Sequence, residues 1–149
     1  MMGQHDNFLA VYPAVLARLA AVDGVKKVLE IGDLADLMVS RSQGRKAAPL
    51  DGAVYVVYGG SRLDGAAGAA QKEVLYFTFV LCKNYAPSGK TDLPAVGRIL
   101  TAIHKAFHGW DAGRDLAAGK FARTAPPAIE YNDGFAFYPT AFTVPVLVK

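Results

Sequence analysis

The sequence predicts an α+β fold in which two main helices pack against a mostly antiparallel β-sheet. Three observations support this prediction. Two segments place apolar residues at helical spacing, several shorter segments are rich in β-branched and aromatic residues, and turn-forming residues separate them. The chain of 149 residues has the size of one domain, so we expect residues 1–149 to fold as one unit.

The first helix is predicted over residues 6–22. Asp6 or Asn7 is placed to cap its start, because such side chains accept hydrogen bonds from the first free N–H groups of a helix. Asp23-Gly24 is expected to end it, since Gly readily adopts the left-handed conformation that terminates helices. The apolar face of this helix comprises Phe8, Val11, Tyr12, Val15, Leu16, Leu19 and Val22.

The next segments alternate between apolar and polar composition. Val25–Ile31 is expected to be a short strand, Asp33–Val39 a helical turn or two, and Ser40–Ala48 a polar, basic loop. Ala53–Tyr58 is predicted to be a buried strand, because Val and Tyr dominate it. These segments begin the sheet and place one group of basic side chains in a loop.

A Gly- and Ala-rich stretch, Gly59–Gln71, has no periodicity, and we interpret it as a mobile hairpin loop. Glu73–Tyr85 is the longest predicted strand. The strands that flank the loop should pair antiparallel, with Tyr58 near one end and Glu73 near the other. The single cysteine, Cys82, lies in an apolar run and is expected to be a buried small side chain rather than a nucleophile or a metal ligand.

Asp92–His108 is the second main helix that the sequence predicts. Thr91 or Asp92 is the expected N-cap, and Pro94 falls in the first turn, where a missing N–H matters little. The apolar stripe of this helix consists of Val96, Ile99, Leu100, Ile103, Phe107 and Trp110.

Two further strands are predicted at Pro126–Tyr131 and Phe135–Val148. Asn132-Asp133-Gly134 between them predicts a tight hairpin turn, because Asn and Gly tolerate positive φ angles. Pro139 and Pro145 lie within the last strand, and each lacks the N–H group that a sheet ladder uses. The last strand is therefore expected to be an edge strand or to have breaks in its pairing.

Composition and charge exclude several classes of protein. With 16 basic and 13 acidic residues the formal net charge is +3, which is below what a dedicated nucleic-acid-binding domain carries. The first residues are polar and lack a basic segment, and no apolar run reaches the ~18 residues that span a bilayer. We therefore expect a soluble protein that is assembled in the cytoplasm and has no membrane partner.

The stretch Ser88-Gly89-Lys90-Thr91 has the ending of a phosphate-binding loop, whose pattern is G-x-x-x-x-G-K-[ST]. Asn84 stands where the first glycine of that pattern belongs, and Pro87 removes one backbone donor. The preceding strand is expected to pair antiparallel, whereas such nucleotide-binding loops belong to parallel sheets. We interpret the stretch as a turn leading into the second helix, with nucleotide binding as the lesser alternative.

His104 and His108 share one side of the predicted second helix and are spaced as metal ligands can be. Lys105 lies where the metal-binding pattern H-E-x-x-H has Glu, and the third histidine, His5, is distant in the sequence. No Ser, His and Asp spacing specifies a triad, and the carboxylates are scattered. We predict no catalytic, metal-binding or cofactor-binding residues, and therefore no enzyme.

Basic side chains gather in two predicted loops, and the candidates are Arg41, Arg45, Lys46 and Arg62. A solvated loop accounts for them without any function. The functional alternative is a basic lining or docking rim that faces DNA phosphates, because Lys and Arg neutralise the charge of the DNA backbone.

The order of segments along nearly the whole chain is itself informative. The opening helix is followed by the strand VKKVLEIG, the segment DLADLMV, the basic loop and APLDGAVYVVYGGSR. The strand VLYFTFVL, a helix that closes with AFHGW, and the final hairpin YNDGFAFYPTAFTVPV complete it. In this order the chain resembles the tail terminator proteins of Mu-like and lambda-like bacteriophages.

The resemblance implies a structural subunit without a catalytic site, located in the virion tail of a phage or prophage. Tail terminators form a ring, usually a hexamer, that ends polymerisation of the tail tube and presents a surface to the head connector. The implied partners are further copies of the chain, the tail tube protein, the head connector protein and non-specific DNA in the lumen. Another ring protein of the neck, such as a head-closure or tail-completion protein, and a small enzyme remain the alternatives.

Overall fold

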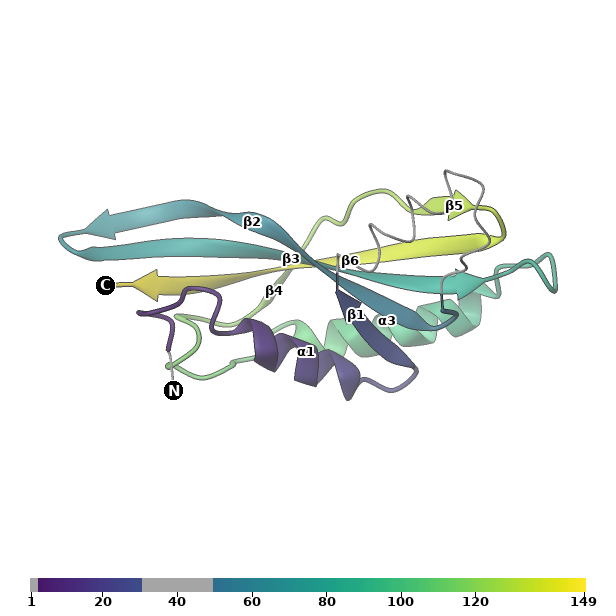
Figure 1. Ribbon diagram of the computed structural model, residues 1–149, viewed down its shortest axis with the longest axis horizontal. Coiled ribbons are helices and arrows are strands. Elements are labelled where there is room, and N and C mark those ends of the chain that lie inside the picture. The colour runs from purple at the N-terminus through teal and green to yellow at the C-terminus, as the bar shows by residue number, and fades with distance from the viewer. Residues whose placement is uncertain (1–2, 31–49) are drawn as a thin grey trace.

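The computed structural model describes residues 3–30 and 50–149, and within these residues six strands form one twisted sheet (Figure 1). The segments predicted at Asp33–Val39 and Ser40–Ala48 lie outside the described residues. In chain order the elements are α1 (Tyr12–Ala20), β1 (Lys27–Glu30), β2 (Ala53–Ala67), β3 (Ala70–Asn84), α3 (Leu93–Phe107), β4 (Ala122–Thr124), β5 (Glu130–Asn132) and β6 (Phe135–Val148).

The strands follow the spatial order β1-β2-β3-β6-β4, and β5 pairs with another part of β6. β1 runs parallel to β2, while every other pair of neighbouring described strands is antiparallel. Both helices cover the same face of the sheet (Figure 1). The prediction of an α+β fold with a mostly antiparallel sheet is confirmed.

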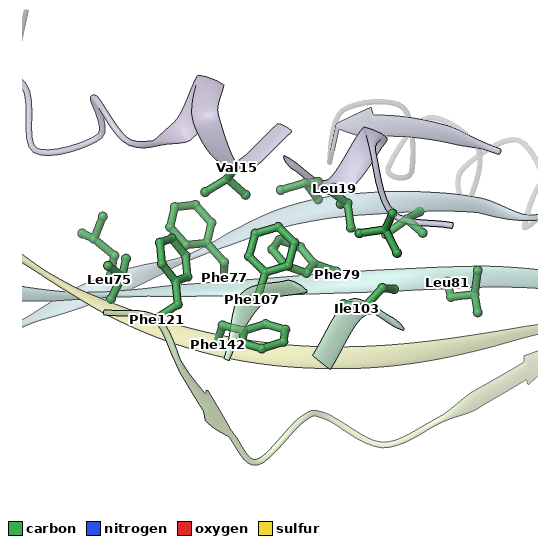
Figure 2. Packing of buried hydrophobic residues seen from close by; sticks show 14 of the residues in the cluster. Val15, Leu19, Leu75, Phe77, Phe79, Leu81, Ile103, Phe107, Phe121 and Phe142 are labelled. Carbon is green, nitrogen blue, oxygen red and sulfur yellow. The ribbon is translucent and has the colours of Figure 1, made fainter. Parts of the chain in front are cut away.

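The main core lies between the two helices and the face of the sheet that they cover (Figure 2). Because side chains alternate along a strand, every second residue of β3 points into this core. Phe107 of α3 packs against that row, and its ring centre lies 4.8 Å from the ring centre of Phe79. Burying such a side chain contributes about 1.5–3 kcal/mol. The fully buried β3 row consists of Leu75, Phe77, Phe79 and Leu81.

The first helix is shorter than the prediction over residues 6–22, since α1 spans only Tyr12–Ala20. Neither Asp6 nor Asn7 caps it, and the N-cap residue is Val11, which makes no side-chain capping bond. Asn7 instead accepts a hydrogen bond from a backbone N–H two residues further along the chain, at 3.0 Å. The residues before α1 form turns instead, in which the N–H groups of Asn7 and Ala10 donate to the carbonyls of Gly3 and Asn7, and Gln4 and His5 are bound to the end of β6.

The second helix is confirmed, with α3 within one residue of the predicted bounds at each end. Asp92 is the N-cap residue, and Pro94 lies in the first turn, as expected. Asp92 makes no side-chain capping bond and adopts a left-handed backbone with φ of 45°. The left-handed backbone of Asp92, rather than a capping side chain, therefore marks the start of the helix.

The structure corrects the prediction of a mobile loop at Gly59–Gln71. β2 and β3 stay paired through this segment, down to Ala67 opposite Ala70. The ladder shifts register at Gly60 and at Gly65, where φ is 102° and 147°. Glycine adopts these angles without the steric cost that a side chain would add. The glycine-rich composition thus builds β-bulges and a tight turn rather than an unpaired loop.

The C-terminal hairpin is confirmed, with differences in its first strand. β6 has the predicted bounds, and the turn before it has positive φ angles of 52° at Asp133 and 85° at Gly134. β5 is shorter than the predicted Pro126–Tyr131, because Pro126 and Pro127 have no N–H to donate. β4 was not predicted, since three residues are too few to show a period.

Pro139 and Pro145 interrupt the pairing of β6 only on the side of β4 and β5. On the other side the pairing with β3 is continuous, with Pro139 opposite Val80 and Pro145 opposite Val74. The Pro145 carbonyl accepts the N–H of Ala118 at 2.9 Å, so the backbone N and O of Pro145 face away from β3. Pro139 has the same parity along the strand and faces the gap between β5 and β4. The predicted breaks are confirmed, whereas the alternative of an edge strand is wrong.

Candidate functional site

Of the four basic residues predicted to face DNA or a docking partner, the structure places one. Arg41, Arg45 and Lys46 lie outside the described residues. Arg62 lies on β2 opposite Val74 and is exposed. The described residues thus include only one of the four, and their role stays a prediction.

The end of the β2–β3 hairpin, residues 61–72, lies at one end of the elongated sheet, and we call it the arm (Figure 1). Its β3 residues Gln71 and Lys72 pair with Val148 and Leu147 of β6, so the outer edge of its β2 half is the part without a described neighbour. Nearly all of its residues are exposed, and Leu63 keeps 61% of its surface in contact with solvent. The Asp64 carboxylate lies 3.7 Å from the ammonium group of Lys72. Arg62 is therefore the arm cation that has no ion pair within the described residues.

The outer edge of β2 is paired over only its first residues. β1 lies beside Ala53–Val56, and from Val57 to Ala67 no described strand lies beside this edge. Unpaired strand edges carry free N–H and C=O groups that recruit other strands, and natural edges are commonly protected by charged side chains, above all Lys, by Pro or by β-bulges. The two bulges of β2 and the charged side chains of Arg62 and Asp64 protect this edge in part. Val57–Ala67 contains neither Lys nor Pro. This segment is the longest open strand edge in the described part of the chain.

At the C-terminal end of β6, the edge that faces away from β3 is covered by other parts of the chain. The Oε1 atom of Gln4 accepts the N–H of Leu147 at 2.7 Å, and the Nδ1 atom of His5 lies 2.9 Å from the carbonyl oxygen of the same residue. The N–H of Ala118 donates to the carbonyl of Pro145. The open β2 edge and the closed β6 edge therefore lie on opposite sides of the sheet.

The face of the sheet opposite the helices carries a groove of about 220 Å³, which we call the open-face groove. Strands β2, β3 and β6 form its floor, and the chain just before and within β5 forms a second wall. Among the described residues of the lining, Glu130 is the charged one, and the others are apolar apart from one threonine. The floor residues are Val57, Thr78, Val80, Phe137 and Pro139, and the wall residues are Pro127, Ala128 and Glu130.

The phosphate-loop-like stretch forms an exposed turn, as predicted. The Oγ atom of Ser88 accepts the N–H of Lys90 at 3.2 Å, and the N–H of Gly89 donates to the carbonyl of Tyr85 at 2.8 Å. These N–H groups are therefore engaged within the turn rather than directed at a ligand. β3, which precedes the turn, is antiparallel to both of its neighbours.

The two histidines at the C-terminal end of α3, His104 within the helix and His108 directly after it, occupy the predicted boundary and surface positions. His104 is partly buried, with its ring centre 6.3 Å from that of Phe142. Burial, and then the positive charge of Arg123, lowers the pKa of His104. The Nδ1 atom of the exposed His108 accepts the backbone N–H of Arg123 at 3.1 Å. No group of three His, Cys, Asp or Glu side chains that could hold a metal occurs within residues 3–30 and 50–149.

The side chains of Cys82 and Tyr12 have roles in packing and in joining elements of the fold. Cys82 is fully buried, which confirms the prediction for the single cysteine. The hydroxyl of Tyr12 on α1 donates to the Oε1 atom of Glu30 on β1 at 2.8 Å. Burial, together with this hydrogen bond and the negative charge of Glu30, raises the pKa of Tyr12 to about 12. The contact joins a helix to the sheet.

Sequence analysis predicted neither the arm nor the open-face groove. One signal for the groove was present, because AVYVVY at Ala53–Tyr58 is apolar at successive positions rather than at alternate ones. Such a run indicates a strand covered on both faces. Val57, which points away from the helices, is a residue of this run and lies on the groove floor.

Comparison with protein families gave one whole-chain match. The model described as phage tail terminator protein matches residues 4–149. No curated protein matched the chain significantly. Among the described residues, none of the helices has the length and apolar character that crossing a membrane requires.

Proposed function

Because the chain belongs to the phage tail terminator family and is thus a structural component of a phage tail, we propose that it forms a ring that caps the tail tube. In this role the ring ends polymerisation of the tube and offers the surface to which the head joins. The observation that carries the proposal is the family match over residues 4–149. The same match supports a role without catalysis.

The described surface suits ring formation. A ring requires a heterologous interface, in which two different patches of one subunit meet the complementary patches of its neighbours. The edge of β2 from Val57 to Ala67 is one such patch, because no strand of the described residues pairs with it and its backbone groups can pair with another chain. The closed edge of β6 makes a symmetric edge-to-edge dimer through that strand unfavourable.

We assign four partners to this protein. They are further copies of this chain, with a hexamer as the proposed assembly, the tail tube protein, the head connector protein and non-specific DNA in the lumen. Arg41, Arg45 and Lys46 are proposed to face the DNA, where cations would neutralise phosphates, and Arg62 is proposed to belong to a docking surface.

Tail length tests the capping function. A phage that lacks this protein should make tails of irregular length, and expression of the protein in trans should restore a uniform length. Electron micrographs of tails from both infections give the length distributions. Uniform, normal-length tails without the protein would contradict the proposal and favour another ring protein of the neck.

Assembly is tested separately on the purified protein. Native mass spectrometry and negative-stain images should show closed rings, alone or on purified tail tubes. A protein that stays monomeric in both settings contradicts ring formation.

A further inference from the structure

We propose that in the ring the arm of each subunit enters the open-face groove of the next, with Arg62 placed beside the neighbouring Glu130. This inference rests on the proposed ring, and it names the surfaces that join two subunits. It assigns a function to the arm and to the groove, which the fold of a single subunit does not use.

The arm and the groove complement each other in chemistry. The arm offers an exposed apolar side chain, Leu63, and a cation, Arg62, that has no ion pair within the described residues. The groove offers an apolar floor and one carboxylate, Glu130, whose side chain is exposed and has no ion pair within residues 3–30 and 50–149. Each surface therefore holds the charge that the other lacks.

The alternation of a strand fits the two walls of the groove. Successive side chains of a strand point to opposite faces, so Leu63 and Arg62 project in opposite directions. A strand that enters edge-first would direct Leu63 at the floor, which includes Val57 and Val80, and Arg62 at the wall that carries Glu130. Small Gly and Ala residues fill most of the remaining arm, which leaves room for close approach of backbones.

The groove cannot receive the arm of its own chain. Val57 is the β2 residue of the groove floor, and from it β2 continues to Ala67 with no described strand beside its outer edge, so the strand leaves the groove at this residue. At about 3.3 Å per residue, Ser61 and Ala67 lie roughly 13 and 33 Å beyond that point. The occupant is therefore the arm of a second copy, and the contact is heterologous, as a closed ring requires.

Charge reversal tests the proposed pair. Arg62→Glu and Glu130→Arg should each weaken ring assembly, by roughly two- to fivefold for each subunit interface, and these factors multiply around the ring. The double variant Arg62→Glu/Glu130→Arg should restore assembly. Arg98→Glu on the exposed surface of α3 changes the net charge as Arg62→Glu does and should leave assembly unchanged. All these side chains are exposed, so circular dichroism should show unaltered folding.

A disulfide tests the geometry directly. Arg62→Cys/Glu130→Cys should give a ladder of covalently linked subunits under oxidising conditions, and the buried native Cys82 should not interfere. Arg98→Cys/Glu130→Cys should give no ladder.

The outcomes separate the two proposals. Wild-type rings that are insensitive to the charge reversals and form no ladder contradict the arm contact but leave the ring intact. A wild-type protein that forms no ring, alone or on tail tubes, contradicts both. Rescue by the double variant together with the ladder supports the arm contact.

Discussion

Replacing Phe107 with alanine should destabilise the subunit more than any surface change. Its side chain is fully buried, and its ring centre lies 4.8 Å from that of Phe79 and 5.5 Å from that of Phe142. Trp110 and Phe121 lie 5.5 and 5.8 Å away. Removing a buried Phe side chain costs about 3–5 kcal/mol, because a cavity is added to the lost transfer free energy. The neighbouring strands are held in place by their hydrogen-bond ladders and cannot collapse into the cavity, so we expect a loss of unfolding free energy near the upper end of this range.

The free energy of unfolding is measured by urea titration, followed by far-UV circular dichroism, at a subunit concentration at which wild type is monomeric. The matched control is Phe8→Ala, whose side chain is 37% exposed, and its expected loss is below about 1 kcal/mol. Phe107→Leu, with an intermediate loss, keeps the test informative if the alanine variant does not fold. Equal losses for Phe107→Ala and Phe8→Ala would refute the assigned role of the aromatic cluster between α3 and the sheet.

Three further predictions concern single side chains outside this cluster. The pKa of His104 is lower in the folded chain than its usual value of about 6.5, so the unfolded chain binds the proton first, and the free energy of unfolding should fall as the pH falls below about 6.5. His104→Gln should flatten that part of the profile of stability against pH, and an unchanged slope would contradict the assigned role of His104. The pKa of about 12 for folded Tyr12 lies above the unfolded value of about 10, so stability should fall as the pH rises through 10 to 12. Tyr12→Phe should remove that slope and cost about 0.5–1.5 kcal/mol at neutral pH, through loss of the bond to Glu30. Titration with Mg-ATP at millimolar concentration should give no heat and no thermal shift, and a shift that Lys90→Ala abolished would restore the nucleotide hypothesis.

Some parts of the candidate site were predictable from sequence and others were not. The turn at residues 88–91 and the boundary position of His104 follow from local composition, because turn chemistry and the apolar stripe of a helix act over a few residues. The groove depends on residues from β2, β3, β6 and the segment before β5, which are distant in sequence. No pattern within one segment reports how such residues meet.

By itself, the sequence determined the elements with strong periodicity. The apolar stripe of α3, the β-branched and aromatic run of β3 and the turn before β6 each encode their structure locally, and the order of these segments places the chain in its family.

Only the tertiary structure decided where α1 begins, how Gly59–Gln71 pairs and which edge of the sheet stays open. α1 begins late because the backbone before it is folded into turns, in which Asn7 and Ala10 donate to Gly3 and Asn7, and Gln4 and His5 are bound to β6. The glycine-rich segment is a strand because β3 supplies a partner for its backbone. Backbone hydrogen bonds between distant segments have no local signature, since every residue type except proline carries the same N–H and C=O groups.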